Sequence, residues 1–517
     1  MTTNEHGERV LVTSASDLSR AAECEFAVAR DLDTRLERVP AVEQPNDAML
    51  ERTSTMGDAH EAAIIADYRT RAAHPDDVLE IDRADSAGLD AIEPYAQQTL
   101  DALQRGVPVI VQATFVDREH SRGAPGGLPI AFVGYADFLV RTPDGAYRVQ
   151  DSKLARRAKV TALLQLAAYA EQLERLGIPV DREVELILGN RELSIHRLDD
   201  IAPVLRARRA RLHQLLRDRD AADAPIAWRD PSVTYCRSCA WCEHEIAAHD
   251  DVSQVAGLTG TQWTKLGAAG IETLAQLADS RGPVDGIAAS TLDTLRLQAE
   301  LQRHAAGAEP GTAPPVCVRD PAVLHALPAP SPGDLYFDFE GDPLYTEHNP
   351  ARWGLDYLFG MVDTDSAFTA YWAHSFADER DALLAFLADV QARRATHPDL
   401  HVYHYAAYER THLRSLSARH GVGEDIVDEW LRSGLLVDLY PVVRKALRVG
   451  SPSYSIKYLE PIYWPEARAG AAVARGDDSV AEYVRSRELR AAGDTAAAQQ
   501  ILDDIGDYNR VDCVSTL

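Results

Sequence analysis

Two carboxylates and an amine in the first half of the chain have the types and spacing to hold a divalent metal ion. Asp137, Asp151 and Lys153 lie in a stretch that reads GYADFLV, RTPDGA and YRVQDSK. Side chains alternate along a strand, so Asp151 and Lys153 should point to the same face. Carboxylate oxygens suit Mg²⁺ or Mn²⁺, and a nearby ammonium can orient an attacking water or counter the charge that develops on a phosphate. An isolated D-x-K also occurs on ordinary surface hairpins.

The neighbouring residues predict the elements that position these groups. Thr142-Pro143-Asp144-Gly145 separates two runs of apolar and β-prone residues, which predicts a hairpin with a tight turn. Asp137 lies on its first strand, and the D-x-K ends its second. Downstream, Gln165 and Tyr169 are four residues apart in an apolar-periodic helix, LLQLAAYAEQL, so they share a face that can turn toward the hairpin.

The ordered motifs resemble the RecB-like branch of the PD-(D/E)XK nuclease family. They are G-x-x-D at Gly134–Asp137, D-x-K at Asp151–Lys153 and Q-x-x-x-Y at Gln165–Tyr169. The resemblance implies a restriction-endonuclease-like α/β domain that cleaves phosphodiester bonds with Mg or Mn. In that family the two aspartates bind the metal, the lysine orients water or counters charge, and the glutamine and tyrosine position the strand.

The same family carries a His or Glu beside the metal, on a helix that precedes the hairpin. The stretch MGDAHE at residues 56–61 matches this helix. His60 is the better match for the metal ligand, and Glu61 is the alternative.

Four of the six cysteines are placed as a metal site. Cys236, Cys239 and Cys242 form C-x-x-C-x-x-C, and Cys24 stands far upstream. In a reducing compartment such a group indicates metal binding rather than disulfides, and four thiolates suit either zinc or an iron-sulfur cluster. The RecB-like resemblance implies a 4Fe-4S cluster, because many members bracket the nuclease core with one cysteine before it and three after it. Zinc stays the alternative.

A second set of carboxylates occupies the last third of the chain. Asp338 and Glu340 share one face of the expected strand DLYFDFE, and Tyr508 and Asp512 lie four apart on an expected helix. The pattern resembles the RNase H-like exonucleases of the DEDD class, which open with D-x-E and close with Y-x-x-x-D. That resemblance implies two divalent ions held by four carboxylates. Glu409 stands where the class has its middle aspartate, so a degenerate domain kept for binding is the alternative.

Composition bounds the class of protein. The 517 residues are 46% hydrophobic and 26% charged, as in globular proteins, and the length predicts about two to four domains. No apolar run approaches the ~20 residues of a membrane span, and the N-terminus lacks the pattern of a secretory signal. We expect a soluble cytoplasmic protein with no membrane contact. The net charge of -27 argues against nonspecific binding to polyanions, so any nucleic-acid binding must be local.

The chain is expected to be an α/β multidomain protein. We expect a RecB-like nuclease domain at 1–250, a helical domain resembling the helix-hairpin-helix module at 251–305, a Pro/Ala/Gly-rich linker at 306–332 and an RNase H-like domain at 333–517. A small packing domain is the alternative for the second. Basic clusters lie beside the hairpin and on a later helix, at Arg156, Arg157 and Lys159 and at Arg206, Arg208, Arg209, Arg211, Arg217 and Arg219.

The function these motifs indicate is metal-dependent hydrolysis of DNA, by an exonuclease in repair, recombination or defence. Single-stranded DNA and duplex ends are the expected substrates, with RNA as a further possibility. The chain stops at Leu517, just after Asp512, which suggests a fragment of a longer protein with a helicase in the same chain or in trans. The alternative function is a catalytically degenerate nucleic-acid-binding or assembly module.

Overall fold

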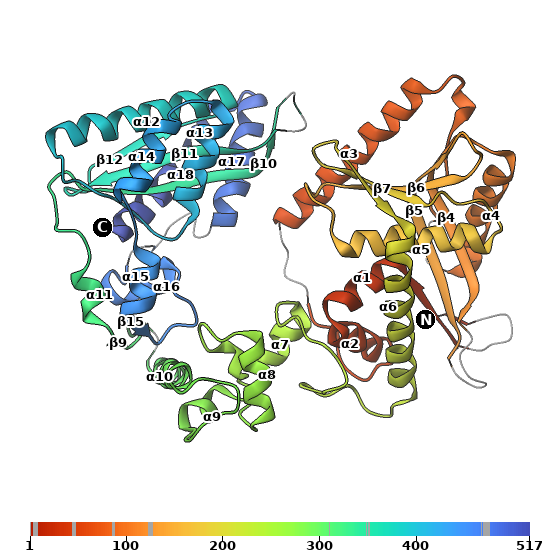
Figure 1. Cartoon of the computed structure of the whole chain (residues 1–517), viewed down its shortest axis with the longest axis horizontal. Coiled ribbons are helices and arrows are strands. Elements are labelled where there is room, and N and C mark those ends of the chain that lie inside the picture. Colours follow the sequence, from red (N-terminus) through yellow and green to blue (C-terminus); the bar gives the residue numbers. More distant parts are fainter. Residues whose placement is uncertain are drawn as a thin grey trace. The chain divides into compact units, whose positions relative to one another are not determined.

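The computed structural model divides the chain into two compact units, residues 1–245 and 246–517 (Figure 1). It describes residues 2–3, 9–43, 48–84, 88–121, 128–309, 311–347, 349, 352–466, 468 and 476–517. The division falls inside helix α7 (Ala240–Ala248), close to the expected end of the first domain. The helical segment and the last expected domain belong to one unit.

The first unit is built on a mixed sheet whose centre is the expected hairpin. Strands β5 and β6 pair antiparallel, and β6 pairs parallel with β7. Gly145 takes φ 90° in the turn, where its amide donates to the Thr142 carbonyl at 2.9 Å. The described strands are β1 (Thr2–Thr3), β2 (Arg9–Ser14), β3 (Val78–Glu80), β4 (Val109–Ser121), β5 (Ile130–Arg141), β6 (Tyr147–Lys153), β7 (Glu183–Leu188) and β8 (Leu193–Arg197).

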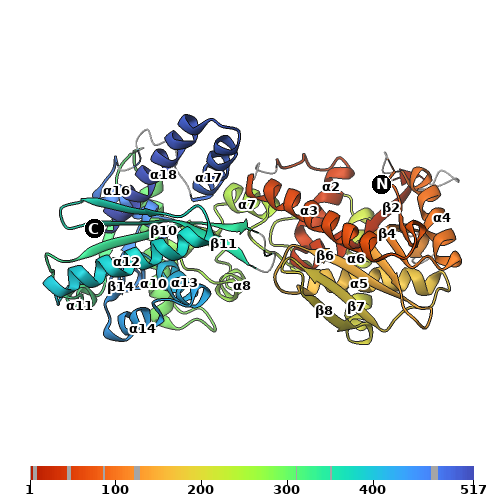
Figure 2. The ribbon, with the colours of Figure 1, turned by 90° about the horizontal axis from the view of Figure 1, so that it is seen from above.

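Helices cover both faces of this sheet (Figures 1 and 2). The larger core packs α1, α2, α5 and α6 against strand residues such as Leu139, Val149 and Leu186. On the other face α3 buries Ile64 and Ile65 against Phe138. The helices are α1 (Ala15–Glu23), α2 (Glu25–Arg35), α3 (Ala48–Arg71), α4 (Leu89–Arg105), α5 (Val160–Arg175), α6 (Leu198–Ala221) and α7. The end of β6 that carries the D-x-K therefore lies between two helical layers.

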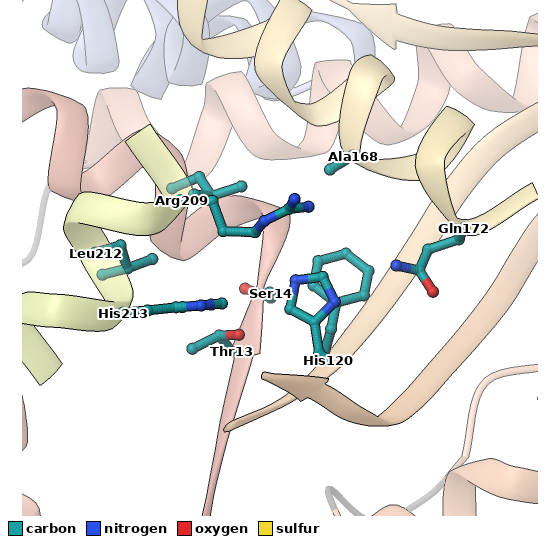
Figure 3. Close-up of a pocket in the computed structure, with 10 residues that line it drawn as sticks. Thr13, Ser14, His120, Ala168, Gln172, Arg209, Leu212 and His213 are labelled. Atoms are coloured by element: carbon teal, nitrogen blue, oxygen red, sulfur yellow. The ribbon is translucent and has the colours of Figure 1, made fainter. Parts of the chain in front are cut away.

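Two histidine rings line a small cavity between α6 and the sheet (Figure 3). His120 and His213 meet edge to face with their centroids 5.4 Å apart, and Arg209 and Gln172 also line the space. The cavity has a volume of about 10 Å³, room for a single water molecule. It is therefore a polar detail of the core rather than a ligand site.

His213 should make the first unit sensitive to acid. Burial, with smaller contributions from His120 and Arg217, lowers the pKa of His213 to about 3. In the unfolded chain, where a histidine has a pKa of ~6.5, His213 binds a proton more tightly than in the folded protein. The contribution of neutral His213 to the free energy of unfolding is therefore fully present above pH ~6.5 and is lost as the pH falls toward 3. We expect a loss of ~2 kcal/mol by pH 5, measured by denaturant unfolding. His213→Gln should flatten this dependence and the exposed His74→Gln should not; a wild-type curve that is flat from pH 8 to 5 would contradict the assignment.

The second unit begins with short helices around a small core. Leu266, Leu277 and Leu295 pack together, and Gly270 takes φ 74° in the turn between α8 and α9. The helices are α8 (Gly260–Ala268), α9 (Leu274–Asp279) and α10 (Ala289–Ala306). The following segment differs from the expected linker: β9 (Val316–Val318) pairs antiparallel with β15 (Leu447–Val449), and α11 spans Pro321–His325. Backbone pairing supplies an order that its Pro-rich composition does not indicate.

A five-stranded sheet forms the rest of this unit, in the order β12-β11-β10-β13-β14. Helices α12, α13 and α14 cover one face, and α17 and α18 cover the other (Figure 2). Strands β10 to β12 are antiparallel neighbours, whereas β13 and β14 run parallel to β10. The strands are β10 (Leu335–Thr346), β11 (Trp353–Asp363), β12 (Phe368–Trp372), β13 (Val402–His404) and β14 (Leu436–Asp438).

The helices of this region complete the fold. They are α12 (Phe376–Thr396), α13 (Tyr408–His420), α14 (Glu424–Ser433), α15 (Leu439–Ala446), α16 (Ile456–Tyr463), α17 (Gly476–Ala491) and α18 (Thr495–Thr516). Within the part of the chain that the structure describes, none of the helices combines the length and apolar composition needed to span a membrane.

Candidate functional site

Three carboxylates of the second unit converge between β10 and α18. Oxygen atoms of Asp338, Glu340 and Asp512 all lie within 4.8 Å of one another. The two strand residues share a face because they are two apart on β10, and α18 packs across that face. Such a set of oxygen donors suits a hard divalent cation such as Mg²⁺ or Mn²⁺.

Glu409 joins this cluster from the first turn of α13. It is buried and lies beside Asp338, whose protonated form it stabilises by a hydrogen bond. Its other neighbour is His404, whose Nδ1 lies 3.1 Å from Glu409 Oε2. The structure thus brings all four expected carboxylates together, with glutamate in the middle position.

The ionisation of the cluster depends on a cation. Burial, followed by the charge of Asp512, raises the pKa of Glu340 to about 8. Burial and then the charges of Asp512 and Glu340 raise the pKa of Asp338 well above its usual range. Carboxylates this close repel one another when all are ionised, and a bound divalent cation removes that repulsion.

Asn509 and Gly360 fix the position of Asp338. The Asn509 side-chain amide donates to Asp338 Oδ2 at 2.8 Å. Gly360 lies opposite Asp338 on β11, and a Cβ there would lie 1.6 Å from Asn509 Oδ1. A glycine is therefore required where α18 meets the sheet. On the other side, Ser479 of α17 donates to Glu340 Oε2 at 2.9 Å.

Two cations border the cluster. Arg468 pairs with Asp512 and holds Glu460 through two hydrogen bonds of 2.7 and 2.8 Å. Lys457 donates to the Tyr508 hydroxyl, and its Nζ lies 4.8 Å from the centre of that ring. Tyr508 itself is buried, and its pKa is raised by burial and by the charge of Asp512. Lys457 and Arg468 lie outside the motifs, so no sequence pattern marks them.

The hairpin of the first unit forms a second polar centre. Lys153 Nζ lies 2.6 Å from Asp151 Oδ2, and Asp137 Oδ2 accepts hydrogen bonds from the Ser152 amide and hydroxyl at 2.8 and 2.9 Å. Burial, followed by the charge of Asp137, raises the pKa of Asp151 well above its usual range. Burial opposes protonation of Lys153, yet the charges of Asp151 and Asp137 raise its pKa. These three residues therefore act on one another electrostatically.

The upstream helix carries both Glu61 and His60, and Glu61 acts electrostatically on this centre. Burial and the charge of Asp137 raise the pKa of Glu61, which also acts on Lys153. His60 Nε2 instead lies 3.3 Å from the Ile187 carbonyl oxygen. Ile187 is the β7 partner of Ser152, between Asp151 and Lys153 on β6, so His60 also contacts a strand next to the D-x-K. His60 and Glu61 both stay candidates for the helix ligand.

A substitution at each of these positions tests which is the ligand. Glu61→Gln should weaken Mn²⁺ binding to the first unit by roughly tenfold or more, since it removes a charged oxygen donor. His60→Gln is the matched control and should leave the affinity within about twofold. Mn²⁺ binding is measured by calorimetry in an Asp338→Asn background, so that the cluster of the second unit does not contribute to the signal. A larger loss with His60→Gln would restore the histidine as the ligand.

Gln112 supports Glu61 from β4. Its amide donates to Glu61, and its side-chain oxygen accepts a hydrogen bond of 3.0 Å from Arg83 Nε. Gln112 takes φ 55°, a conformation uncommon outside glycine. No motif marked it, because its role depends on a long-range contact.

Gln165 and Tyr169 both lie on α5, as the sequence predicts, but in different surroundings. Gln165 lines an open cleft of about 250 Å³ that also exposes Lys153, Arg157 and Lys159. Tyr169 is buried, and its pKa is raised by burial and by the charge of Asp151. Gly134 gives the Tyr169 ring room, because a Cβ at Gly134 would lie 2.9 Å from that ring.

The second basic cluster, on α6, is largely paired within the protein. Arg209, Arg211 and Arg219 form ion pairs with Glu171, Glu25 and Asp33 respectively. These arginines therefore hold α6 against α2 and α5.

The four cysteines meet in the first unit. The Sγ atom of Cys24 lies 3.7 Å from that of Cys242 and 4.0 Å from that of Cys239, and the Cys236 and Cys242 sulfurs are 3.9 Å apart. The amides of Ser238 and Cys239 both point at the Cys236 sulfur. Hydrogen bonds from Cys239 and Cys242 lower the pKa of Cys24 to about 4. The pKa of Cys242 is raised instead, because its thiol keeps the proton that these hydrogen bonds share. Four thiols this close to one another suit a thiophilic metal.

Sulfur spacing bears on which metal fits. A tetrahedral ion with bonds of ~2.3 Å to sulfur places its ligands about 3.8 Å apart, which agrees with the observed separations. A 4Fe-4S cluster inserts four iron atoms between the thiolates, so its ligands must stand farther apart. The donor set fits both groups, whereas the spacing fits a single ion.

The comparisons with known proteins address the second unit. No curated protein matches the chain. Residues 335–517 match the family model RNase_H_2 of the RNase_H superfamily. The match begins at β10, which carries Asp338 and Glu340, and includes α18, which carries Asp512. The carboxylate cluster and the match together indicate a nuclease-type domain with residues that could bind a metal ion. The C-terminal part of this chain, residues 335–517, is therefore similar to the RNase H superfamily.

Proposed function

We propose that this protein is a metal-dependent nuclease that hydrolyses phosphodiester bonds of DNA. The observation that carries the proposal is the convergence of Asp338, Glu340 and Asp512 inside the RNase H superfamily domain. This convergence joins residues that are far apart in sequence at one buried, acidic point, which is costly without a cation.

Each side chain of this site has a proposed role. Asp338, Glu340 and Asp512 hold Mg²⁺ or Mn²⁺, and Glu409 is the fourth carboxylate. When bound, the metal supplies Lewis-acid stabilisation of the charge on the phosphate. Tyr508, held by Lys457 beside Asp512, is proposed to border the scissile phosphate.

The first unit is proposed as a second nuclease centre of the RecB-like kind. Asp137 and Asp151 are its metal ligands, with Glu61 replacing His60 as the helix ligand. Lys153 faces a cleft lined by no acidic residue, where Arg157, Lys159 and Gln165 can meet a phosphodiester backbone. Buried Tyr169 then acts as a support for Gly134 and the first strand of the hairpin rather than as a contact to the substrate.

The four-cysteine centre is proposed to be structural. Cys24 precedes the nuclease core and Cys242 follows it, 218 residues later, so a shared metal ties the two ends of the unit together. The RecB-like resemblance favours 4Fe-4S, and the sulfur spacing favours zinc. An exonuclease working with a helicase, in the same chain or in trans, is the setting we propose.

End-labelled substrates test the proposed function directly. The full chain is incubated with single-stranded DNA, duplex DNA or RNA labelled at either end, with Mg²⁺, Mn²⁺ or EDTA. Stepwise loss from one end would show an exonuclease and its polarity. Asp151→Ala and Asp338→Asn, singly and together, then assign each activity to a unit. If the wild-type protein leaves every substrate intact, the chain is a binding or assembly module.

A further inference from the structure

A cleft outside both carboxylate centres has the composition of an anion site. It measures about 310 Å³ and lies in the second unit, between the helical segment and the end of α15. Arg444 and Arg448 line it, together with Gly257 and a group of uncharged polar side chains. These are Gln262, Ser290, Thr291, Thr294, Gln298 and Tyr454. Among the described residues that line the cleft none is acidic, although the chain carries a net charge of -27.

Hydrogen bonds fix the two walls of the cleft to each other. Gln298 of α10 donates to the Val449 carbonyl at 2.8 Å and accepts from the Tyr454 hydroxyl at 2.7 Å. Val449 and Tyr454 are buried in a small core against which Ala256 packs. The cleft is therefore preformed, which lowers the entropy cost of binding.

The two guanidinium groups of the cleft contact uncharged partners. Arg444 lies over the Tyr440 ring, with its Cζ 5.6 Å from the ring centre, and Arg448 donates to main-chain carbonyls. Across the described ranges, neither forms an ion pair with a carboxylate, in contrast to the paired arginines of α6. A guanidinium has five N–H donors in a planar fork, which suits phosphate oxygens.

The chain leads directly from this cleft to the carboxylate cluster. Tyr454, at the cleft, is three residues from Lys457, which contacts Tyr508 beside Asp512. Three residues span at most ~10 Å, a length that a few consecutive nucleotides of one strand can cover. An anion in the cleft and a phosphate at the cluster can therefore belong to one molecule.

We propose that this cleft binds the phosphate groups of a single nucleic-acid strand that is held for cleavage at the RNase H-type cluster. The proposal rests on the proposed nuclease function and adds the site that holds the strand next to the point of cleavage. A free nucleotide has the same phosphate chemistry, and the experiment below separates the two sources.

The test measures binding of a DNA strand under conditions that prevent its cleavage. Fluorescence anisotropy measures the affinity of the full chain for a labelled 20-nucleotide single-stranded DNA in EDTA at several salt concentrations. Arg444→Gln/Arg448→Gln should weaken binding roughly tenfold to a hundredfold and reduce the salt slope by about 1.4, since each phosphate contact on a single strand contributes ~0.7. Arg380→Gln/Arg432→Gln removes two exposed charges from α12 and α14 and should change neither.

A second variant and a second ligand keep the outcomes distinct. Thr291→Glu places a carboxylate in the cleft without removing either arginine, and it should weaken the strand by a similar factor. The nucleotide dTMP is the second ligand, and its binding is measured with the same variants. Unchanged affinity for the strand in both cleft variants would overturn the proposal. Loss of dTMP binding without loss of strand binding would also overturn it, because the cleft would then bind free nucleotides. If the wild-type protein does not bind the strand in EDTA but cleaves it with Mn²⁺, only the proposal for the cleft fails. If the protein neither binds nor cleaves the strand, the proposed nuclease function fails as well.

Discussion

Asp338→Asn is expected to abolish the metal-dependent activity of the RNase H-type domain. Asp338 lies at the centre of the cluster, within reach of Glu340, Asp512 and Glu409. Stabilisation of the transition state by the metal is worth several kcal/mol, so the rate should fall by about 10³-fold or more. The measurement is the degradation of end-labelled DNA in an Asp151→Ala background, where only this site can act.

Asn is the matched replacement because it keeps the shape of the side chain and the contact with Asn509. The exposed Asp365→Asn, in the turn after β11, serves as the control and should keep full activity. If Asp338→Asn retains the activity of its background, the cluster is not catalytic. If the Asp151→Ala background is already inactive, the second domain is degenerate, as the unusual glutamate at position 409 would allow.

Metal binding at the same cluster should also depend on pH. The pKa of Glu340 is raised to about 8, so in the metal-free protein its contribution to stability is present at low pH and is lost as the pH rises toward 8. A bound cation favours the ionised carboxylates, so it offsets this loss of stability at high pH. Mn²⁺ should therefore raise the melting temperature more at pH 8.5 than at pH 6, as calorimetry can measure, and Asp338→Asn should remove most of the difference. An equal rise at both pH values would contradict a cation bound to this cluster.

Cys24→Ser is expected to empty the four-cysteine centre and destabilise the first unit. The metal closes a loop of more than 200 residues, and cross-links of that length stabilise by ~3–5 kcal/mol. For a unit of this size the melting temperature should fall by on the order of 10 °C. The second unit should keep its own transition in the same calorimetric scan. Cys513→Ser, which removes a buried thiol outside the centre, is the control for the loss of a cysteine.

The same preparation identifies the metal. Anaerobically purified protein with a 4Fe-4S cluster should be brown, absorb broadly near ~400 nm and contain about four iron atoms per chain. One zinc and no iron would instead agree with the sulfur spacing. If both Cys24→Ser and Cys242→Ser keep the metal and the melting temperature, the four sulfurs do not bind one shared metal.

The sequence alone determined the elements that carry chemistry, because their signals are local. The turn at Thr142–Gly145 has a proline and a glycine at positions that demand their backbone conformations, and the structure contains the hairpin. The alternation that pairs Asp338 with Glu340, and the spacing of four between Tyr508 and Asp512, follow from strand and helix periods alone. The cysteine spacing similarly indicated a shared site, since thiols so placed have few other uses in a reducing compartment.

Which side chains meet across elements depends on tertiary packing and cannot be predicted from local patterns. Whether Glu61 or His60 is the helix ligand depends on the rotation of α3 against the sheet, which neighbouring residues cannot reveal. Asn509 reaches Asp338 because Gly360 leaves space on another strand, and Lys457 reaches Tyr508 from a helix without a motif. The pairing of β9 with β15 ordered a segment whose composition indicated a linker. Each of these contacts joins residues remote in sequence, so its free energy depends on packing geometry rather than on local pattern.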